Sequence, residues 1–141
     1  MSDQTQITAA GTGRRTSHGG RALAIALATL ATVLVWTVAK LLDVDLAAQS
    51  GANERQEVTL PAVIIVTLLV GLVGWGLLAL LERVSTRGLT IWTIVAVVFF
   101  LISLLGPLGG VTTGAKITLA AMHTVTAAVL IPLFRRTSGQ R

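Results

Sequence analysis

Four long apolar runs constrain the fold of this chain more than any other feature of the sequence. They cover residues 22–42, 58–81, 89–108 and 117–134, and charged residues lie mostly between them. A helix rises about 1.5 Å per residue, so runs of this length span roughly 30 Å, the thickness of the hydrocarbon core of a bilayer. The runs therefore predict four transmembrane helices packed as an all-α membrane bundle.

The composition supports a membrane protein and argues against a soluble domain. Charged residues make up only 12% of the chain and hydrophobic residues 53%, whereas a soluble domain has about a quarter of its residues charged. The formal net charge is +5, but the basic residues flank the apolar runs, where positive charge orients membrane helices. The lipid bilayer is therefore the expected partner, and a nucleic acid is not.

The chain divides into one membrane domain and two short tails. Residues 1–20 contain almost no large apolar side chains, so we expect a disordered N-terminal tail. The four spans form the domain at residues 21–136, and residues 137–141 form a C-terminal tail. Arg14, Arg15 and Arg21 precede the first span, and we interpret them as a signal for membrane orientation.

Small residues predict where the helices approach one another. Ala24, Ala28 and Thr32 recur every four residues, and Thr67 and Gly71 form a similar pair in the second span. Small side chains at this spacing lie on one face of a helix and let a neighbouring helix pack closely. These positions therefore predict interior surfaces of the first two helices.

The connections carry their own signals. Residues 43–57 read as a polar, acidic loop, and the short connection at residues 82–87 makes the second and third helices antiparallel neighbours. The Gly106-Pro107 pair is expected to end the third span, because proline has no N–H for a helical hydrogen bond. Helix N-caps are expected at Thr59 and at Thr112 or Thr113.

The distribution of basic residues predicts the orientation in the membrane. Four spans place both termini on one side. Eight basic residues lie on that side (Arg14, Arg15, Arg21, Arg83, Arg87, Arg135, Arg136, Arg141), and three lie on the other (Lys40, Arg55, Lys116). Since cytoplasmic segments are enriched in Lys and Arg, we expect both termini in the cytoplasm and the chain in a bacterial cytoplasmic membrane.

Five polar side chains fall at similar depths in the outer half of the predicted bilayer. They come from all four spans: Trp36, Thr37, Thr67, Ser103 and His123. If they face inward together, this polar layer either holds the helices together by hydrogen bonds or forms a ligand or proton site that opens outward. Lys116 lies one heptad before His123 and is the candidate charge at the outer face.

The sequence offers little for catalysis. No acidic residue lies within a span, and there is no cysteine. The single histidine within the spans, His123, provides neither a set of metal ligands nor a pair of nucleophile and base. We therefore predict no catalytic residue, no metal site, no cofactor and no enzymatic activity.

The last span carries the most distinctive pattern, AAMHTVTAAVLIPLFRR at residues 120–136, with Met122-His123 at its centre. With four spans and a short turn between the second and third, the chain resembles an uncharacterised family of small four-helix membrane proteins from actinobacteria. The resemblance implies the fold and assigns no activity.

Two functions fit these observations. The first is a non-enzymatic, multi-pass inner-membrane protein that acts through helix packing or through binding a partner, either a second copy or another membrane protein. The alternative is a small oligomeric transporter or channel subunit with a polar site around His123.

Overall fold

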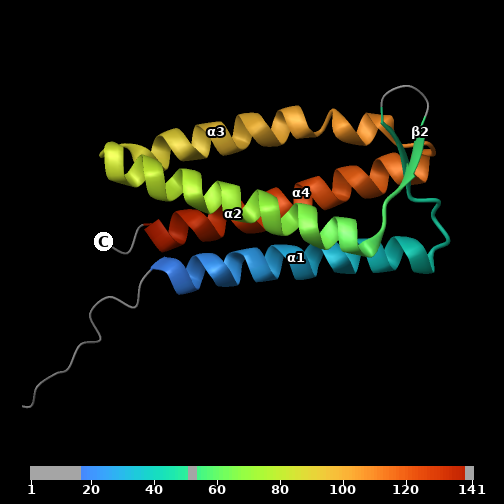
Figure 1. Ribbon diagram of the computed structural model, residues 1–141, viewed down its shortest axis with the longest axis horizontal. Helices are drawn as coiled ribbons and strands as arrows, with labels where there is room; N and C mark the ends of the chain where they lie inside the picture. The colour runs from blue at the N-terminus through green and yellow to red at the C-terminus, as the bar shows by residue number, and fades with distance from the viewer. Residues whose placement is uncertain (1–16, 51–53, 139–141) are drawn as a thin grey trace, which may run out of the picture.

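The computed structural model describes residues 17–50 and 54–138, and its four long helices lie side by side in a bundle (Figure 1). The elements in chain order are α1 (Ser17–Leu41), β1 (Ala47–Ser50), β2 (Glu54–Glu57), α2 (Leu60–Val84), α3 (Gly88–Ser103), the 3₁₀ helix η1 (Gly106–Gly109) and α4 (Thr113–Ser138). The predicted all-α bundle of four membrane-length helices is confirmed, because all four segments are long and apolar enough to cross a membrane.

The helices alternate in direction, which gives the bundle two distinct ends. The start of α1, the α2–α3 connection and the end of α4 lie together, and we call this the terminal end (Figure 1). The two strands and η1 lie at the other end, the hairpin end. Around the bundle, α1 packs against α2 and α4, and α3 packs against the same two helices from the opposite side.

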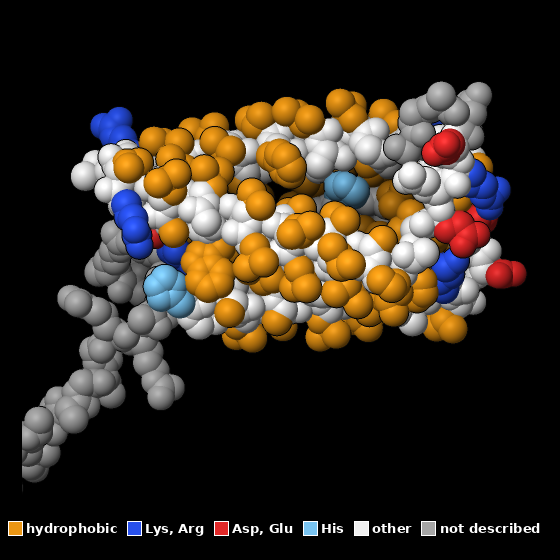
Figure 2. Space-filling model, viewed as in Figure 1, with side chains coloured by type: hydrophobic (Ala, Val, Ile, Leu, Met, Phe, Trp, Pro, Cys, Tyr) orange, Lys and Arg blue, Asp and Glu red, His pale blue; other side chains and the backbone are white. Residues whose placement is uncertain are grey.

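The outer surface of the bundle is apolar between its two ends. Leucine, isoleucine and valine side chains are exposed along α1, α2 and α3, and Ile117 is exposed on α4. Figure 2 shows apolar side chains covering the middle of the molecule, with charged side chains gathered at the ends. A soluble monomer rarely exposes so large an apolar area. The chain is therefore a multi-pass membrane protein.

The predicted stripes of small residues do face the interior. Ala24, Ala28 and Thr32 are all buried, in the helix that packs most extensively against α4. Thr67 and Gly71 are buried as well. A Cβ on Gly71 would lie 2.8 Å from a side-chain carbon of Ile25, so only glycine lets α1 and α2 approach this closely.

Local chemistry fixes the ends of several helices. α1 ends in a Schellman motif: Asp43 has a positive φ of 58°, and the N–H of Val44 donates to the carbonyl of Ala39. Aspartate tolerates this left-handed conformation better than most residues. Thr112 caps α4, because its Oγ1 accepts from the N–H of Ala115. Thr59 occupies the N-cap position of α2 without a capping hydrogen bond from its side chain.

The predicted tail boundaries need correction at the terminal end. α1 begins at Ser17, so residues 17–20 are helical and not disordered, while residues 1–16 lie outside the described residues. α4 continues through Ser138, two residues into the predicted C-terminal tail. The two helix ends support each other: a Cβ on Gly20 would lie 2.6 Å from Cγ2 of Thr137, so the helices touch where glycine leaves room.

The loop predicted at residues 43–57 contains a β-hairpin. β1 and β2 pair antiparallel, with Ala47 opposite Glu57 and Ser50 opposite Glu54. The hairpin also joins the connection before α4, because Ala48 forms a bridge with Gly110 and the N–H of Val111 donates to Ala47. Buried Leu46 anchors its base.

The third span also differs in detail from the prediction. α3 ends at Ser103, and the chain continues through a turn into η1, so the span at residues 89–108 is not one continuous helix. Pro107 cannot donate to the carbonyl of Ser103 and disfavours helical geometry in the residue before it. The break therefore comes earlier than the Gly106-Pro107 pair itself.

Candidate functional site

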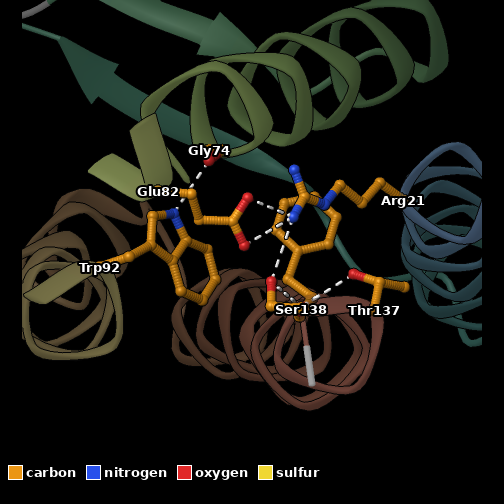
Figure 3. Close-up of polar contacts among 7 residues, drawn as sticks. Arg21, Gly74, Glu82, Trp92, Thr137 and Ser138 are labelled. Carbon is orange, nitrogen blue, oxygen red and sulfur yellow. Dashed lines mark hydrogen bonds and ion pairs between the residues drawn. The ribbon is translucent and has the colours of Figure 1, made fainter. Parts of the chain in front are cut away.

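A buried ion pair at the terminal end is the most organised polar feature of the described residues. Nη2 of Arg21 in α1 lies 2.9 and 2.8 Å from the two carboxylate oxygens of Glu82 in α2. The same nitrogen donates to Oγ of Ser138 in α4, at 3.1 Å. We call Arg21, Glu82 and Ser138 the polar clamp (Figure 3), because it joins three helices at a single guanidinium.

The remaining helix, α3, reaches the clamp through aromatic packing. The hydroxyl of Ser138 donates to the backbone carbonyl of Phe134, and the ring of Phe134 packs against Trp92 of α3 with 5.5 Å between centroids. Nε1 of Trp92 donates to the carbonyl of Gly74 in α2, at 2.9 Å. This bond joins α3 to α2 beside the clamp (Figure 3).

Helix periodicity carries the charged side chains of the clamp into the interior. Arg21 precedes buried Ala24 by three residues and Ala28 by seven, so the three share one face of α1. Glu82 follows buried Leu78 by four residues and lies on the same face of α2. The apolar stripes that pack the bundle therefore extend into the clamp.

Burial makes this ion pair energetically demanding. The side chains of Arg21 and Glu82 are only 2% and 10% exposed, so both charges have lost most of their hydration. Nε of Arg21 is buried and finds no acceptor among the described residues. A buried charge is tolerated only while its partner is present, so the clamp makes the positions of α1, α2 and α4 depend on one another.

A hollow of about 440 Å³ lies beside the clamp at the terminal end. Glu82 and Ser138 form part of its wall, together with Arg83, Ser85 and Leu89 of the α2–α3 region. Its lining contains one carboxylate, one guanidinium and the three hydroxyls of Ser85, Thr86 and Ser138. The hollow therefore gives polar solutes access to the clamp from the end of the bundle.

The residues of the predicted polar layer make mostly local hydrogen bonds. Thr37 donates to Val33, Thr67 to Val63 and Ser103 to Phe100, each within its own helix. Nε1 of Trp36 donates to the carbonyl of Val58 in the segment before α2. No hydrogen bond of the described residues joins two members of the layer.

Their exposure also differs. Thr67 is buried, whereas Trp36, Ser103 and His123 are half-buried and Thr37 is exposed on the outer surface of α1. Nδ1 of His123 lies 2.7 Å from the carbonyl of Leu119, one turn earlier in α4. Lys116 is exposed in the first turn of α4, at the hairpin end. The structure thus places the predicted residues at separate points and does not gather them around one ligand position.

The pattern of one family matches residues 12–140, nearly the whole chain. The chain belongs to DUF6069. This is a family of unknown function, which agrees with the resemblance to a four-helix membrane family without an assigned activity. Neither the curated proteins nor the solved structures contain a match.

The clamp of this DUF6069 member was missed by sequence reasoning, although one signal pointed to it. Among residues 17–138, Glu82 is the single acidic residue near the terminal end, and the other four acids lie at positions 43, 45, 54 and 57. A lone carboxylate between two apolar runs, surrounded by arginines, needs a basic partner. The interpretation of Arg21 as a signal for membrane orientation does not predict an ion pair with Glu82.

No group of three or more His, Asp or Glu side chains gathers in residues 17–50 and 54–138 of the DUF6069 chain in a way that could hold a metal ion. The chemistry that the clamp offers is charge pairing and hydrogen bonding. Its geometry suits holding helices in register.

Proposed function

We propose that this DUF6069 member is a non-enzymatic multi-pass protein of the bacterial cytoplasmic membrane that acts by binding a membrane protein partner through the outer surface of its bundle. The observation that carries this proposal is the shallow packing of α3. Of its 16 residues, only Gly88 and Trp92 are buried in the bundle. The outward face of α3, which includes Ile94, Val98 and Ile102, is therefore free for another transmembrane helix.

The polar side chains within the spans support a binding role over catalysis. Seven threonines of the helices donate to the carbonyl four residues earlier: Thr29, Thr32, Thr37, Thr67, Thr93, Thr124 and Thr126. Hydroxyls satisfied by their own backbone are not arranged around a reacting group. What remains available for recognition is the outer apolar surface and the charged ends.

The proposed orientation places the terminal end in the cytoplasm. Five arginines of the described residues lie there, against Lys40, Arg55 and Lys116 at the hairpin end. Alkaline phosphatase fusions test this: a fusion within the hairpin loop is expected to be active, and one after residue 138 inactive. The reverse pattern would overturn the orientation and leave the partner-binding proposal standing.

Site-specific photo-crosslinking in the native membrane tests partner binding. A photoreactive residue is placed at Ile94, Val98 or Ile102, which α3 exposes, and at buried Leu78 as the matched control. We expect a discrete protein adduct at one or more of the α3 positions and none at Leu78. If outward positions on all four helices give only lipid adducts, partner binding is refuted.

One observation favours a transporter or channel subunit as the second candidate. Since Nδ1 of His123 is engaged by Leu119, Nε2 is the nitrogen directed at the break after α3, and a Cβ on Gly106 would lie 4.0 Å from it. Broken transmembrane helices are common at transport sites. A pH-dependent solute or proton flux in liposomes, lost in His123→Ala, would select this candidate over the first.

A further inference from the structure

A membrane-embedded groove of about 480 Å³ runs along the outer side of the α1–α4 interface. α1 lines it between Leu27 and Leu34, and α4 between Ala128 and Arg136. At about 1.5 Å per residue these stretches are roughly 10–12 Å long. The groove therefore extends through most of one leaflet, starting at the terminal end.

The shape of the groove follows from its residue types. Ala31 and Ala128 have short side chains and leave the space between the helices open, while leucines of α1 stand beside them. Pro132 lies inside α4 and contributes a ring in place of a long side chain. The result is a shallow apolar groove open to the surrounding lipid, and an acyl chain can lie along it.

A guanidinium closes the groove at the level of the membrane surface. Arg136 lines it and is exposed, and none of the ion pairs of the described residues includes it. The only carboxylate near that end in residues 17–138 belongs to Glu82, which already binds Arg21. The charge of Arg136 is therefore available to an anion from outside the bundle.

We propose that this groove binds an anionic phospholipid, with one acyl chain between α1 and α4 and the phosphate on Arg136. The bilayer supplies both parts at the required heights, since the phosphate lies at the surface and the chain directly below it. A second copy of the protein fits less well, because parallel packing across the groove would bring two Arg136 side chains together. This inference does not depend on the proposed protein partner.

Lipid binding by the full chain in a neutral detergent tests the headgroup contact. Native mass spectrometry counts bound phosphatidylglycerol and phosphatidylcholine of identical acyl chains. We expect about a fivefold preference for phosphatidylglycerol, the size of effect that one basic side chain near a membrane surface gives. Arg136→Gln should abolish the preference, and Arg135→Gln, which alters an exposed arginine outside the groove, should retain it.

Variants that fill the groove test whether the acyl chain binds there. Ala128→Leu should weaken the binding of both lipids severalfold. Ala31→Leu is a second groove-filling variant for the case that the first does not fold. Ala26→Leu, at an exposed alanine outside the groove, is the matched control and should leave binding unchanged. Melting curves of each variant verify that the bundle is folded.

Three results would overturn the proposal. Equal loss of preference in Arg135→Gln and Arg136→Gln would show general surface charge and no defined contact. Unchanged lipid binding in both groove-filling variants would show that the acyl chain lies outside the groove. A disulfide-linked dimer formed in membranes by Leu30→Cys, in a protein that has no other cysteine, would show that a second copy occupies the groove.

Discussion

The two ends of the bundle each carry an ion pair, but the two pairs lie in opposite environments. At the terminal end, Arg21 and Glu82 are 2% and 10% exposed. At the hairpin end, Arg55 and Asp45 are 52% and 47% exposed. The first pair joins α1 to α2 across 61 residues, whereas the second closes a segment of ten residues that is also held by strand pairing.

This difference shows that ion pairs of similar length have different roles. An exposed pair gains little, because water and salt screen it and because two flexible side chains must be ordered. A buried pair is required once it has formed, since removing one partner leaves an uncompensated charge. The terminal end should therefore determine the stability of the bundle, and the hairpin end should tolerate change.

The largest expected effect is the loss of the buried carboxylate. Glu82→Gln should lower the free energy of unfolding by about 3–5 kcal/mol, because Arg21 would remain buried without its counter-charge. Titration with a denaturing detergent, starting from mild micelles, measures this quantity. The double variant Arg21→Met/Glu82→Leu should recover much of the loss, since it removes both charges together. A Glu82→Gln protein within about 1 kcal/mol of wild type would contradict this account.

The second prediction concerns the backbone beside the clamp. A Cβ on Gly88 would lie 2.4 Å from the carbonyl oxygen of Leu81, so Gly88→Ala must shift the α2–α3 connection. We expect a loss of about 1–3 kcal/mol, as for overpacked sites. Gly76→Ala is the control, because nothing lies within 4 Å of that position, and it should be neutral or slightly stabilising. Equal melting temperatures for the two variants would refute the close contact.

His123 lies outside the clamp, and a smaller effect is expected there. Its hydrogen bond goes to a carbonyl of its own helix, so His123→Ala should lower stability by about 0.6 kcal/mol and by no more than about 1.7 kcal/mol. Thermal melting of both proteins in mild detergent measures this difference. A loss well above about 1.7 kcal/mol would show that His123 makes contacts beyond this hydrogen bond.

The smallest effect is expected at the exposed pair. Asp45→Asn should change the free energy of unfolding by less than about 1 kcal/mol, and added salt should remove what difference there is. Melting at low and high salt measures both. A loss as large as that of Glu82→Gln would show that the two ends do not differ in the way that their burial indicates.

The comparison also explains which parts of the fold could be read from the sequence. Apolar length determined the number of helices, and small residues such as Ala24 and Gly71 marked the packed faces correctly. At the terminal end, the predicted spans stop short of the observed ends of α1 and α2, because a hydropathy pattern treats each charged residue separately. Arg21 and Glu82 neutralise each other, so both helices continue past the point where a single charge predicts their end.

The hairpin was not predictable from local preference. Its strands, AAQS and ERQE, contain none of the β-branched or aromatic residues that favour strands. They pair because α1 and α2 hold the segment at both ends and because Gly110 pairs with its edge. The direction in which each polar-layer side chain points could not be predicted either, because spans that are apolar all round give no amphipathic signal. Thr37, for example, is exposed on the outer surface of the bundle and does not face inward.

The clamp also has a consequence for how the chain is made. Arg21 is synthesised 61 residues before Glu82, which at about 5–20 residues per second is an interval of roughly 3–12 s. During that time the first helix must keep its guanidinium in contact with water or lipid headgroups at the membrane edge. Once the second helix has inserted in the correct direction, Glu82 arrives and Arg21 can enter the protein. Insertion of α2 in the wrong direction would put its carboxylate on the far side of the membrane, so the ion pair can form only when α1 and α2 have opposite directions.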